Sequence, residues 1–407
     1  MGSAPGKLVE FEEAIDIVLG EAARVAPRRS ERMPLLSALG RVLAEEIIAD
    51  RDQPAFDRST RDGFALRASE AGAWLTVAGQ IRAGQSPPGD RLAESSAAGI
   101  MTGAALPEGA DAVVMVEHVV AEANAIRLAE ARTLVAGENV VPRGAEARAG
   151  DVLLGPGQRL GAAEIALAAS CGYAQLTVYA RPKVAIVATG DELVEVTEAP
   201  GPHQIRNSNS YAIAAMVAAA GALPERLAIA RDVREDLRER TAQGRATDLL
   251  VLSGGVSMGE YDLVEEVLAE FGAEFFFTGV RMQPGKPLVF GRLPALGDDR
   301  MCYFFGLPGN PISTQVTFHC FVEMFVRALA GEAGAGPNWA QATLAQGVAA
   351  KAGLTRLLPA RMSGIAVTLA GWQGSGDLAA NARANCYAEL LPGRAYAAGE
   401  VIRVLLR

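Results

Sequence analysis

The chain has 407 residues, of which 50% are hydrophobic and 21% charged, so a largely disordered chain is excluded and roughly two to four packed domains are expected. The formal net charge of −9 argues against a nucleic-acid-binding protein, which needs a basic face. No uncharged apolar run reaches about 18 residues, and acids occupy the N-terminal segment, so we expect a cytoplasmic protein without a signal peptide or membrane span.

The first half of the chain mixes helical and β-type patterns. Apolar residues at helical spacing predict a helix over about 8–26 and a second over about 34–48. From about 50 to 144 the chain breaks into short apolar pieces separated by Gly, Pro and Asp, which is typical of a small β-rich domain. A turn-rich stretch over 142–157 then precedes a short buried helix over 161–171.

From Lys183 onward, short apolar strands alternate with helices. The expected strands are KVAIVATG, LAIAR, TDLLVLSGG, AEFFFTGV, KPLVFG and MCYFFGLPG, and the expected helices are SNSYAIAAMVAAAGA, EDLRERTAQ, DLVEEVLAEFG and a long closing helix over 312–331. This alternation predicts a parallel sheet that is covered by helices on both faces.

The fold class is therefore a multidomain α/β protein. Residues 181–331 are expected to form a central α/β/α domain with a parallel sheet, and residues 51–141 an inserted β-rich domain. A helical linker domain combines 1–50 with 142–180, and a small C-terminal β-barrel domain spans 332–407 after a Gly/Ala/Pro linker.

Acidic residues follow three of the strands expected in the central domain. Glu192, Asp232 and Asp262 lie in loops at the carboxyl ends of strands, where ligands bind in such sheets. Clustered carboxylates repel one another unless a cation neutralises them, and Mg²⁺ is the natural partner beside phosphate. The structural alternative is that Asp232 and Asp262 are helix N-caps.

A glycine-rich turn follows one of these strands. Backbone N–H groups in such a strand-to-helix turn can bind phosphate, although the segment is neither a Walker A loop nor a GxGxxG motif. Its candidate binding residues are Gly254, Gly255, Ser257 and Gly259.

Two proline-containing corners complete the candidate site. In MQPGKP, Lys286 is flanked by prolines that restrict the backbone, so its ammonium is presented to a phosphate or oxyanion or is simply a surface lysine in a turn. In LPGNP, Pro308, Gly309 and Asn310 form a strand–turn–helix corner that contacts a ligand or serves only as a structural turn.

Taken together, these segments resemble the molybdopterin molybdenumtransferases, the family of the bacterial MoeA proteins and the gephyrin E domain. The resemblance covers nearly the whole chain in order. The segments that carry it are FDRSTRDGFAL, IMTGAALPEGADAVV, VPRGAEARAGDVLL, IVATGDEL, IRNSNS, LSGGVSMGEYD, MQPGKP and GLPGNP.

This resemblance implies an elongated four-domain homodimer whose central domain is molybdopterin-binding-like. It implies that adenylylated molybdopterin and molybdate are the substrates, that molybdate is inserted at the dithiolene with release of AMP, and that Mg²⁺ assists. Molybdopterin adenylyltransferase and molybdoenzyme maturation factors are the implied partners, without nucleic acid or membrane. Glu192, Asp232 and Asp262 match family acids that hold the metal, and Lys286 matches the PGKP lysine.

The resemblance also places residues outside the central domain at the site. Asp62 and Thr102 match family positions on the inserted domain, which the family places against the partner subunit. Arg361 and Ser375 match anion-binding positions in the last domain, against the alternatives of a solvated Arg and a turn Ser. Gln283 stands where many members have lysine, so the loop lacks one cation that Arg61, beside Asp62, is a candidate to replace.

Two other functions stay open at this point. A non-catalytic scaffold on the same fold would bind partner peptides, but a pure scaffold need not keep the acids named above. A molybdopterin adenylyltransferase would share the loops of the central domain, but it would not need the added domains.

Overall fold

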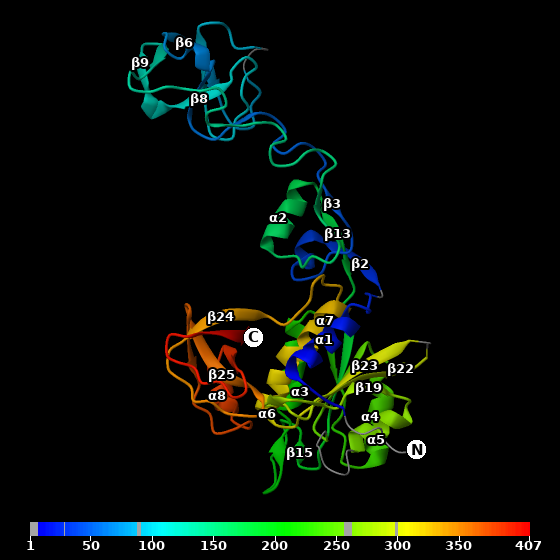
Figure 1. The fold of residues 1–407 in the computed structure, drawn as a ribbon. Coiled ribbons are helices and arrows are strands. Elements are labelled where there is room, and N and C mark those ends of the chain that lie inside the picture. Colours follow the sequence, from blue (N-terminus) through cyan, green and yellow to red (C-terminus); the bar gives the residue numbers. More distant parts are fainter. Residues whose placement is uncertain (1–6, 28, 88–90, 256–262, 298–299) are drawn as a thin grey trace.

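The computed structural model describes residues 7–27, 29–87, 91–255, 263–297 and 300–407. The molecule is elongated, with the inserted β-rich unit at one end, a connecting unit in the middle, and the α/β unit packed beside a barrel at the other end (Figure 1). This arrangement and the elements below confirm the multidomain α/β fold class. Among the described helices, none is both long and apolar enough to cross a membrane.

The central sheet of the α/β unit is mixed rather than wholly parallel. Its strand order is β17 (Leu223–Arg226), β14 (Lys183–Ala188), β18 (Leu249–Ser253), β23 (Met301–Leu307), β22 (Val289–Pro294) and β19 (Glu274–Phe277). The first four strands are parallel, whereas β22 and β19 run antiparallel to their neighbours. The expected strand at 227–231 is displaced, because β17 ends at Arg226 and only Ala230 of that segment makes a β-bridge.

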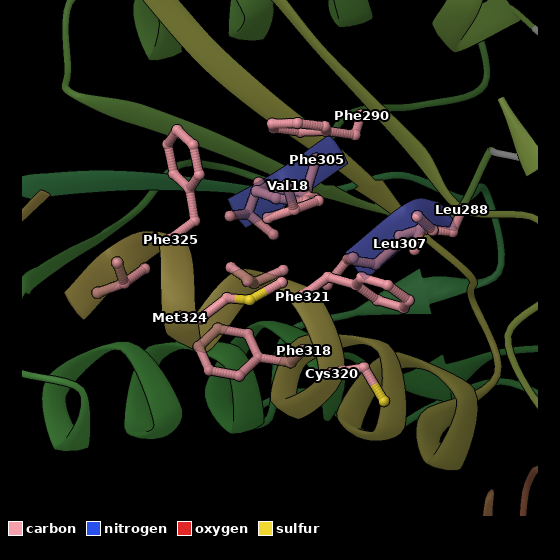
Figure 2. Packing of buried hydrophobic residues seen from close by; sticks show 14 of the residues in the cluster. Val18, Leu288, Phe290, Phe305, Leu307, Phe318, Cys320, Phe321, Met324 and Phe325 are labelled. Carbon is pink, nitrogen blue, oxygen red and sulfur yellow. The ribbon is translucent and has the colours of Figure 1, made fainter. Parts of the chain in front are cut away.

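Helices cover both faces of this sheet because its central strands, β14, β18 and β23, are almost wholly apolar and buried. The helices are α1 (Phe11–Ala22), α3 (Asn209–Ala219), α4 (Arg234–Gly244), α5 (Leu263–Glu270), α6 (Pro311–Thr317) and α7 (Glu323–Leu329), with a π-helical turn, Phe318–Val322, between the last two. The larger core lies under α1, α3, α6 and α7, and the smaller lies under α4 and α5. Figure 2 shows Phe290 and Phe305 in the larger core with Val18 of α1; the two rings stack with centroids 4.4 Å apart.

Residues 8–22 belong to this core, although the sequence placed them in the linker domain. Strand β1 (Leu8–Val9) pairs with β20 (Gly279–Val280), and the buried side of α1 packs in the larger core. The apolar face of α1 must be buried, and the apolar core of the α/β unit is the surface that buries it.

The connecting unit contains no helix at 34–48, so that prediction is wrong. Its elements are β2 (Ser30–Pro34), a 3-10 turn at Leu35–Ala38, β3 (Ile47–Ile48), β12 (Val152–Leu154), α2 (Ala162–Ser170) and β13 (Gln175–Tyr179). Ala38, Leu43 and Ile47 are buried against this unit's own strands and α2. These apolar residues are therefore buried without forming a helix. Gly40 has a φ of +75°, which lies outside the right-handed helical region of backbone conformation.

The inserted unit is built on a six-stranded sheet. The strand order is β8 (Ala112–Met115), β5 (Gly63–Leu66), β7 (Ser96–Ile100), β6 (Leu75–Ile81), β10 (Ala125–Leu128) and β9 (Val119–Glu122). Strands β4 (Arg58–Ser59) and β11 (Val140–Val141) pair where the chain enters and leaves the unit, and 3-10 turns lie at Ala68–Glu70 and Val116–His118.

The C-terminal unit is a closed five-stranded barrel. Its strands are β24 (Trp339–Leu344), β25 (Thr355–Ser363), β26 (Ala366–Leu369), β27 (Cys386–Leu390) and β28 (Val401–Leu406), with α8 (Leu378–Arg383) between β26 and β27. The β25–β27 pairing closes the barrel and removes its free edges. Strand β21 (Met282–Gln283) of the α/β unit pairs with β25, so the two units meet at the MQPGKP loop.

Candidate functional site

A pocket opens at the carboxyl ends of β14, β18 and β23, where a sheet of this kind binds ligands. Its volume is about 490 Å³, and it is open to solvent. The side chains and backbone that line it come from the loops after these strands, from the start of α3, and from the short parallel pair β15 (Leu193–Val194) and β16 (Ile205–Arg206).

Two of the three predicted acids lie together in this pocket. Glu192 and Asp232 both line it, and both side chains are exposed to solvent. The N-cap position of α4 is occupied by Val233, so capping does not account for Asp232. The backbone N–H of Asp232 donates to Oδ1 of Asp191 at 3.3 Å, which adds a third carboxylate beside the pair. The remaining predicted acid, Asp262, lies outside the described residues.

The glycine turn after β18 is held tightly against the loop after β14. Gly254 and Gly255 have φ of +92° and +64°, and both line the pocket. A Cβ on Gly254 would lie 2.5 Å from the carbonyl oxygen of Thr189, and one on Gly255 would lie 2.7 Å from its Oγ1. Only glycine combines this backbone conformation with such close approach. Ser257 and Gly259 lie outside the described residues.

Thr189 is a pocket residue that the sequence did not single out. Its side-chain Oγ1 is buried and has no hydrogen-bond partner among the described residues. A buried hydroxyl without a partner is costly, so this atom is suited to a bond with a bound molecule. Its position beside the glycine turn places that bond where a phosphate would meet backbone N–H groups.

Asn209 ties two of the pocket loops together. Its side-chain Nδ2 donates to the carbonyl of Gly309 at 2.7 Å and to Oγ of Ser253 at 3.2 Å. The IRNSNS segment was noted in the sequence, but the bonds that Asn209 makes depend on residues 44 and 100 positions away.

The LPGNP corner lines the pocket with Pro308, Gly309 and Asn310. Oγ1 of Thr314 donates to the carbonyl of Pro308 at 2.6 Å and to that of Asn310 at 3.0 Å, so the corner is fixed by the first turn of α6. The side chain of Asn310 makes no capping bond, although Asn310 occupies the N-cap position. The corner is thus both a structural turn and a pocket wall.

Three further predicted residues, Lys286, Ser375 and Arg361, do not line the pocket. Lys286 is exposed and forms no ion pair with the described residues, and the adjacent Pro287 lines the pocket. The carbonyl of Ser375 accepts from the N–H of Ile312 at 2.9 Å, which joins the barrel to the start of α6. Arg361 extends from β25 and donates to the carbonyl of Arg383 at 3.3 Å.

Asp62 and Thr102 form their own pair on the inserted unit. Oδ1 of Asp62 accepts from the backbone N–H of Thr102 at 2.7 Å and from its Oγ1 at 3.0 Å. These two bonds hold the pKa of Asp62 below its ordinary value. The sheet that follows Asp62 lies at the far end of the molecule from the pocket-bearing sheet, so one chain does not bring Asp62 to the pocket (Figure 1).

The pocket combines carboxylates, glycines with positive φ and a buried hydroxyl, and Lys286 lies next to its lining residue Pro287. Within the described residues, no three His, Cys, Asp or Glu side chains are grouped to hold a metal by themselves. The arrangement suits a hard cation that shares two carboxylates with the oxygens of an anionic ligand. The fold and this pocket define a multidomain α/β protein with a candidate ligand site at the carboxyl edge of its central sheet.

Comparisons with known proteins identify the family to which the chain belongs. Three family profiles match in order: the MoeA N-terminal region (domain I and II) over residues 9–172, a probable molybdopterin binding domain over 185–328, and the MoeA C-terminal region (domain IV) over 341–406. A molybdopterin molybdenumtransferase of Staphylococcus epidermidis is 32% identical over 98% of this chain and 95% of its own length. Another, from Nostoc sp., is 39% identical over 74% of this chain and 70% of its own length.

Solved structures of MoeA proteins have a similar fold. Two crystal structures of the molybdopterin biosynthesis protein MoeA from Pyrococcus horikoshii each cover 98% of this chain; one has a TM-score of 0.73 at 30% identity over 99% of that chain, the other 0.79 at 26% over 100%. The chain therefore belongs to the molybdopterin molybdenumtransferase (MoeA) family, whose role is in molybdenum cofactor biosynthesis.

Proposed function

We propose that this protein inserts molybdate into adenylylated molybdopterin with Mg²⁺-dependent release of AMP. The observation that carries the proposal is the placement of Glu192 and Asp232 in the same pocket as the Gly254–Gly255 turn. Carboxylates for a cation and N–H groups for phosphate are the two requirements of a substrate that carries a pyrophosphate link.

Glu192 and Asp232 are the residues that would hold Mg²⁺, with Asp191 beside them. Two carboxylates are enough for this ion, because Mg²⁺ usually takes one or two from the protein and the rest of its ligands from phosphate and water. When bound, the cation would offset negative charge on the phosphates. The chain's own groups orient the substrate: the glycine turn and the Thr189 hydroxyl face the phosphates, and Lys286 offers an ammonium to the oxyanion.

The proposal includes a homodimer in which the inserted unit of one copy completes the pocket of the other. Its support is the distance between the Asp62–Thr102 pair and the pocket within one chain. The connecting unit also exposes large apolar side chains, with Leu36 80% exposed and Ile48 and Val152 paired across β3 and β12 at 40% and 53%. Apolar surface of this kind is typical of contacts between subunits.

The test is AMP release from adenylylated molybdopterin by the purified full-length protein. We expect release that requires both molybdate and Mg²⁺. Molybdopterin with ATP should give no adenylylated product, which separates this activity from that of the adenylyltransferase expected to supply the substrate. If the adenylylated substrate stays intact with both ions present, the proposed function is wrong.

Two carboxylate variants locate the activity in the pocket. Glu192→Gln and Asp232→Asn should each lower turnover by about 100-fold or more, because each removes one charge that holds the cation. Glu235→Gln is the matched control, since this exposed acid on α4 does not line the pocket. Equal turnover in all three variants would contradict the placement of the cation.

A further inference from the structure

A second cavity, the junction cavity, lies where the connecting unit joins the α/β unit, at the opposite edge of the central sheet from the pocket. Its volume is about 370 Å³. Lys183 begins β14, Asp248 directly precedes β18 and Arg300 directly precedes β23, and all three line the cavity. The pocket opens at the carboxyl ends of the same three strands. Because a strand rises about 3.3 Å per residue, the two sites are roughly 20 Å apart along β14.

The two chain segments that connect the units also line the junction cavity. Strands β2 and β13 pair antiparallel with Tyr179 opposite Ser30, so the chain enters and leaves the connecting unit side by side. Arg29 directly precedes β2, Arg181 lies just after β13, and both line the cavity. The backbone N–H of Ala180 donates to the carbonyl of Arg29 at 2.8 Å, which continues the pairing as far as the cavity. A molecule bound in the cavity would therefore contact both connecting segments and the edge of the sheet.

Positive charge is in excess among the described residues that line this cavity. Four of them are basic and one is acidic, namely Arg29, Arg181, Lys183, Arg300 and Asp248. Oδ2 of Asp248 accepts from the backbone N–H of Lys183 at 2.7 Å, and the carbonyl of Lys183 accepts from the N–H of Asp248 at 3.0 Å. These bonds fix the backbone from which the Lys183 side chain extends. The side chains of Arg29, Arg181 and Lys183 are exposed and form no ion pair with the described part of the chain.

This group of cations contrasts with the net charge of −9 that the whole chain carries. Like charges around one cavity repel one another, so an anion bound among them lowers their electrostatic energy. Guanidinium groups suit phosphate because two of their N–H groups bond two of its oxygens, and an ammonium adds a compact positive charge. The volume of about 370 Å³ lies within the range of small-molecule sites. Charge and size together favour a small phosphorylated compound.

We propose that the junction cavity binds a small anion that carries two or more phosphate groups, and that this anion joins the connecting unit to the α/β unit. Arg29 and Arg181 bind it from the two connecting segments, and Lys183 binds it from the edge of the sheet. None of the described residues that line this cavity lines the pocket. Binding here therefore does not depend on the reaction proposed above.

The experiment follows the lysine side chains of the full-length protein by NMR while inorganic pyrophosphate is added in the absence of Mg²⁺. Labelling of lysine Cε with ¹³C gives few signals, because the chain has only four lysines: Lys7, Lys183, Lys286 and Lys351. The signal of Lys183 should shift and reach saturation. Sodium chloride at the same ionic strength should not reproduce this shift, because a built site binds the anion rather than being screened by salt.

Arginine variants test the residues of the connecting segments. Arg181→Gln should weaken the binding that is seen at Lys183 by about tenfold, because one charge-assisted contact to phosphate is lost. Arg29→Gln, on the other connecting segment, should weaken it to a similar extent, so the test does not depend on the folding of one variant. Arg82→Gln is the matched control: it removes an exposed arginine of the inserted unit and should bind like the wild type.

Three results would overturn the site at the junction cavity. The first is a Lys183 signal that does not shift, or that sodium chloride shifts as far. The second is equal affinity in Arg181→Gln, Arg29→Gln and Arg82→Gln. The third is a shift of the Lys286 signal alone, which would place pyrophosphate beside the pocket. Absence of AMP release from a protein that shows the Lys183 shift and its loss in the variants would overturn only the proposed function.

Discussion

The side chain of Asn209 donates a hydrogen bond of 2.7 Å to the carbonyl of Gly309, so the start of α3 is joined to the loop that precedes α6. The same amide reaches Ser253 at the end of β18. One side chain therefore sets the spacing of two loops that line the pocket, and the pocket depends on it for shape.

Asn209→Ala should lower the rate of AMP release by about tenfold, while the unfolding free energy falls by only about 1 kcal/mol, because both lost bonds are to neutral groups. Asn338→Ala is the control, since Asn338 is exposed and does not line the pocket. Steady-state kinetics and denaturant unfolding measure the two effects. A stability loss large enough to explain the rate would contradict the positioning role.

Gly254→Ala should destabilise the α/β unit strongly. The substitution combines a φ of +92° with a Cβ that would lie 2.5 Å from the carbonyl oxygen of Thr189. The left-handed backbone alone costs alanine about 1 kcal/mol, and the clash adds to that. Gly272→Ala isolates the first effect, because at φ +76° its Cβ would make only ordinary contacts at 3.9 Å. Equal denaturation midpoints for the two variants would show that the glycine turn is not held as described.

Thr102→Val should raise the pKa of Asp62 toward its ordinary value but leave it below, because the backbone N–H of Thr102 still donates to the carboxylate. A lowered pKa in the folded protein means that this pair stabilises the fold above the ordinary pKa of the carboxyl and stops doing so as pH falls through the lowered value. Carboxyl-carbon NMR titration measures the shift. The pKa of Asp377, lowered chiefly by N–H groups of Ala380 and Gln373, should stay constant.

The central strands were predictable because they are almost wholly apolar, and so was the edge of the sheet at which the pocket opens. Strand β18 is buried at every residue, as a parallel strand between two helical layers must be. Periodicity failed at 34–48, where the same apolar residues are buried as extended chain around Gly40. The pattern shows which residues need burial, but not which surface receives them, as α1 also illustrates.

The candidate site was predictable where a residue lies in the loop after a strand, as Glu192 does after β14. Asp232 also lines the pocket, although β17 ends at Arg226 and only Ala230 of the expected strand makes a β-bridge. Contacts between distant segments were not. Asn209 and Gly309 are 100 positions apart, and no local pattern links them. The unpartnered hydroxyl of Thr189 is likewise visible only once the glycine turn is packed against it.

The most direct measurement of the central claim mixes two inactive variants, Asp62→Asn and Asp232→Asn, under conditions that exchange subunits. If each pocket is completed by the other copy, mixed dimers hold one pocket with both lesions and one with neither. AMP release should then recover to about a quarter of the wild-type rate in an equal mixture. No recovery, with mixed dimers demonstrated by two different tags, would contradict a site shared between copies.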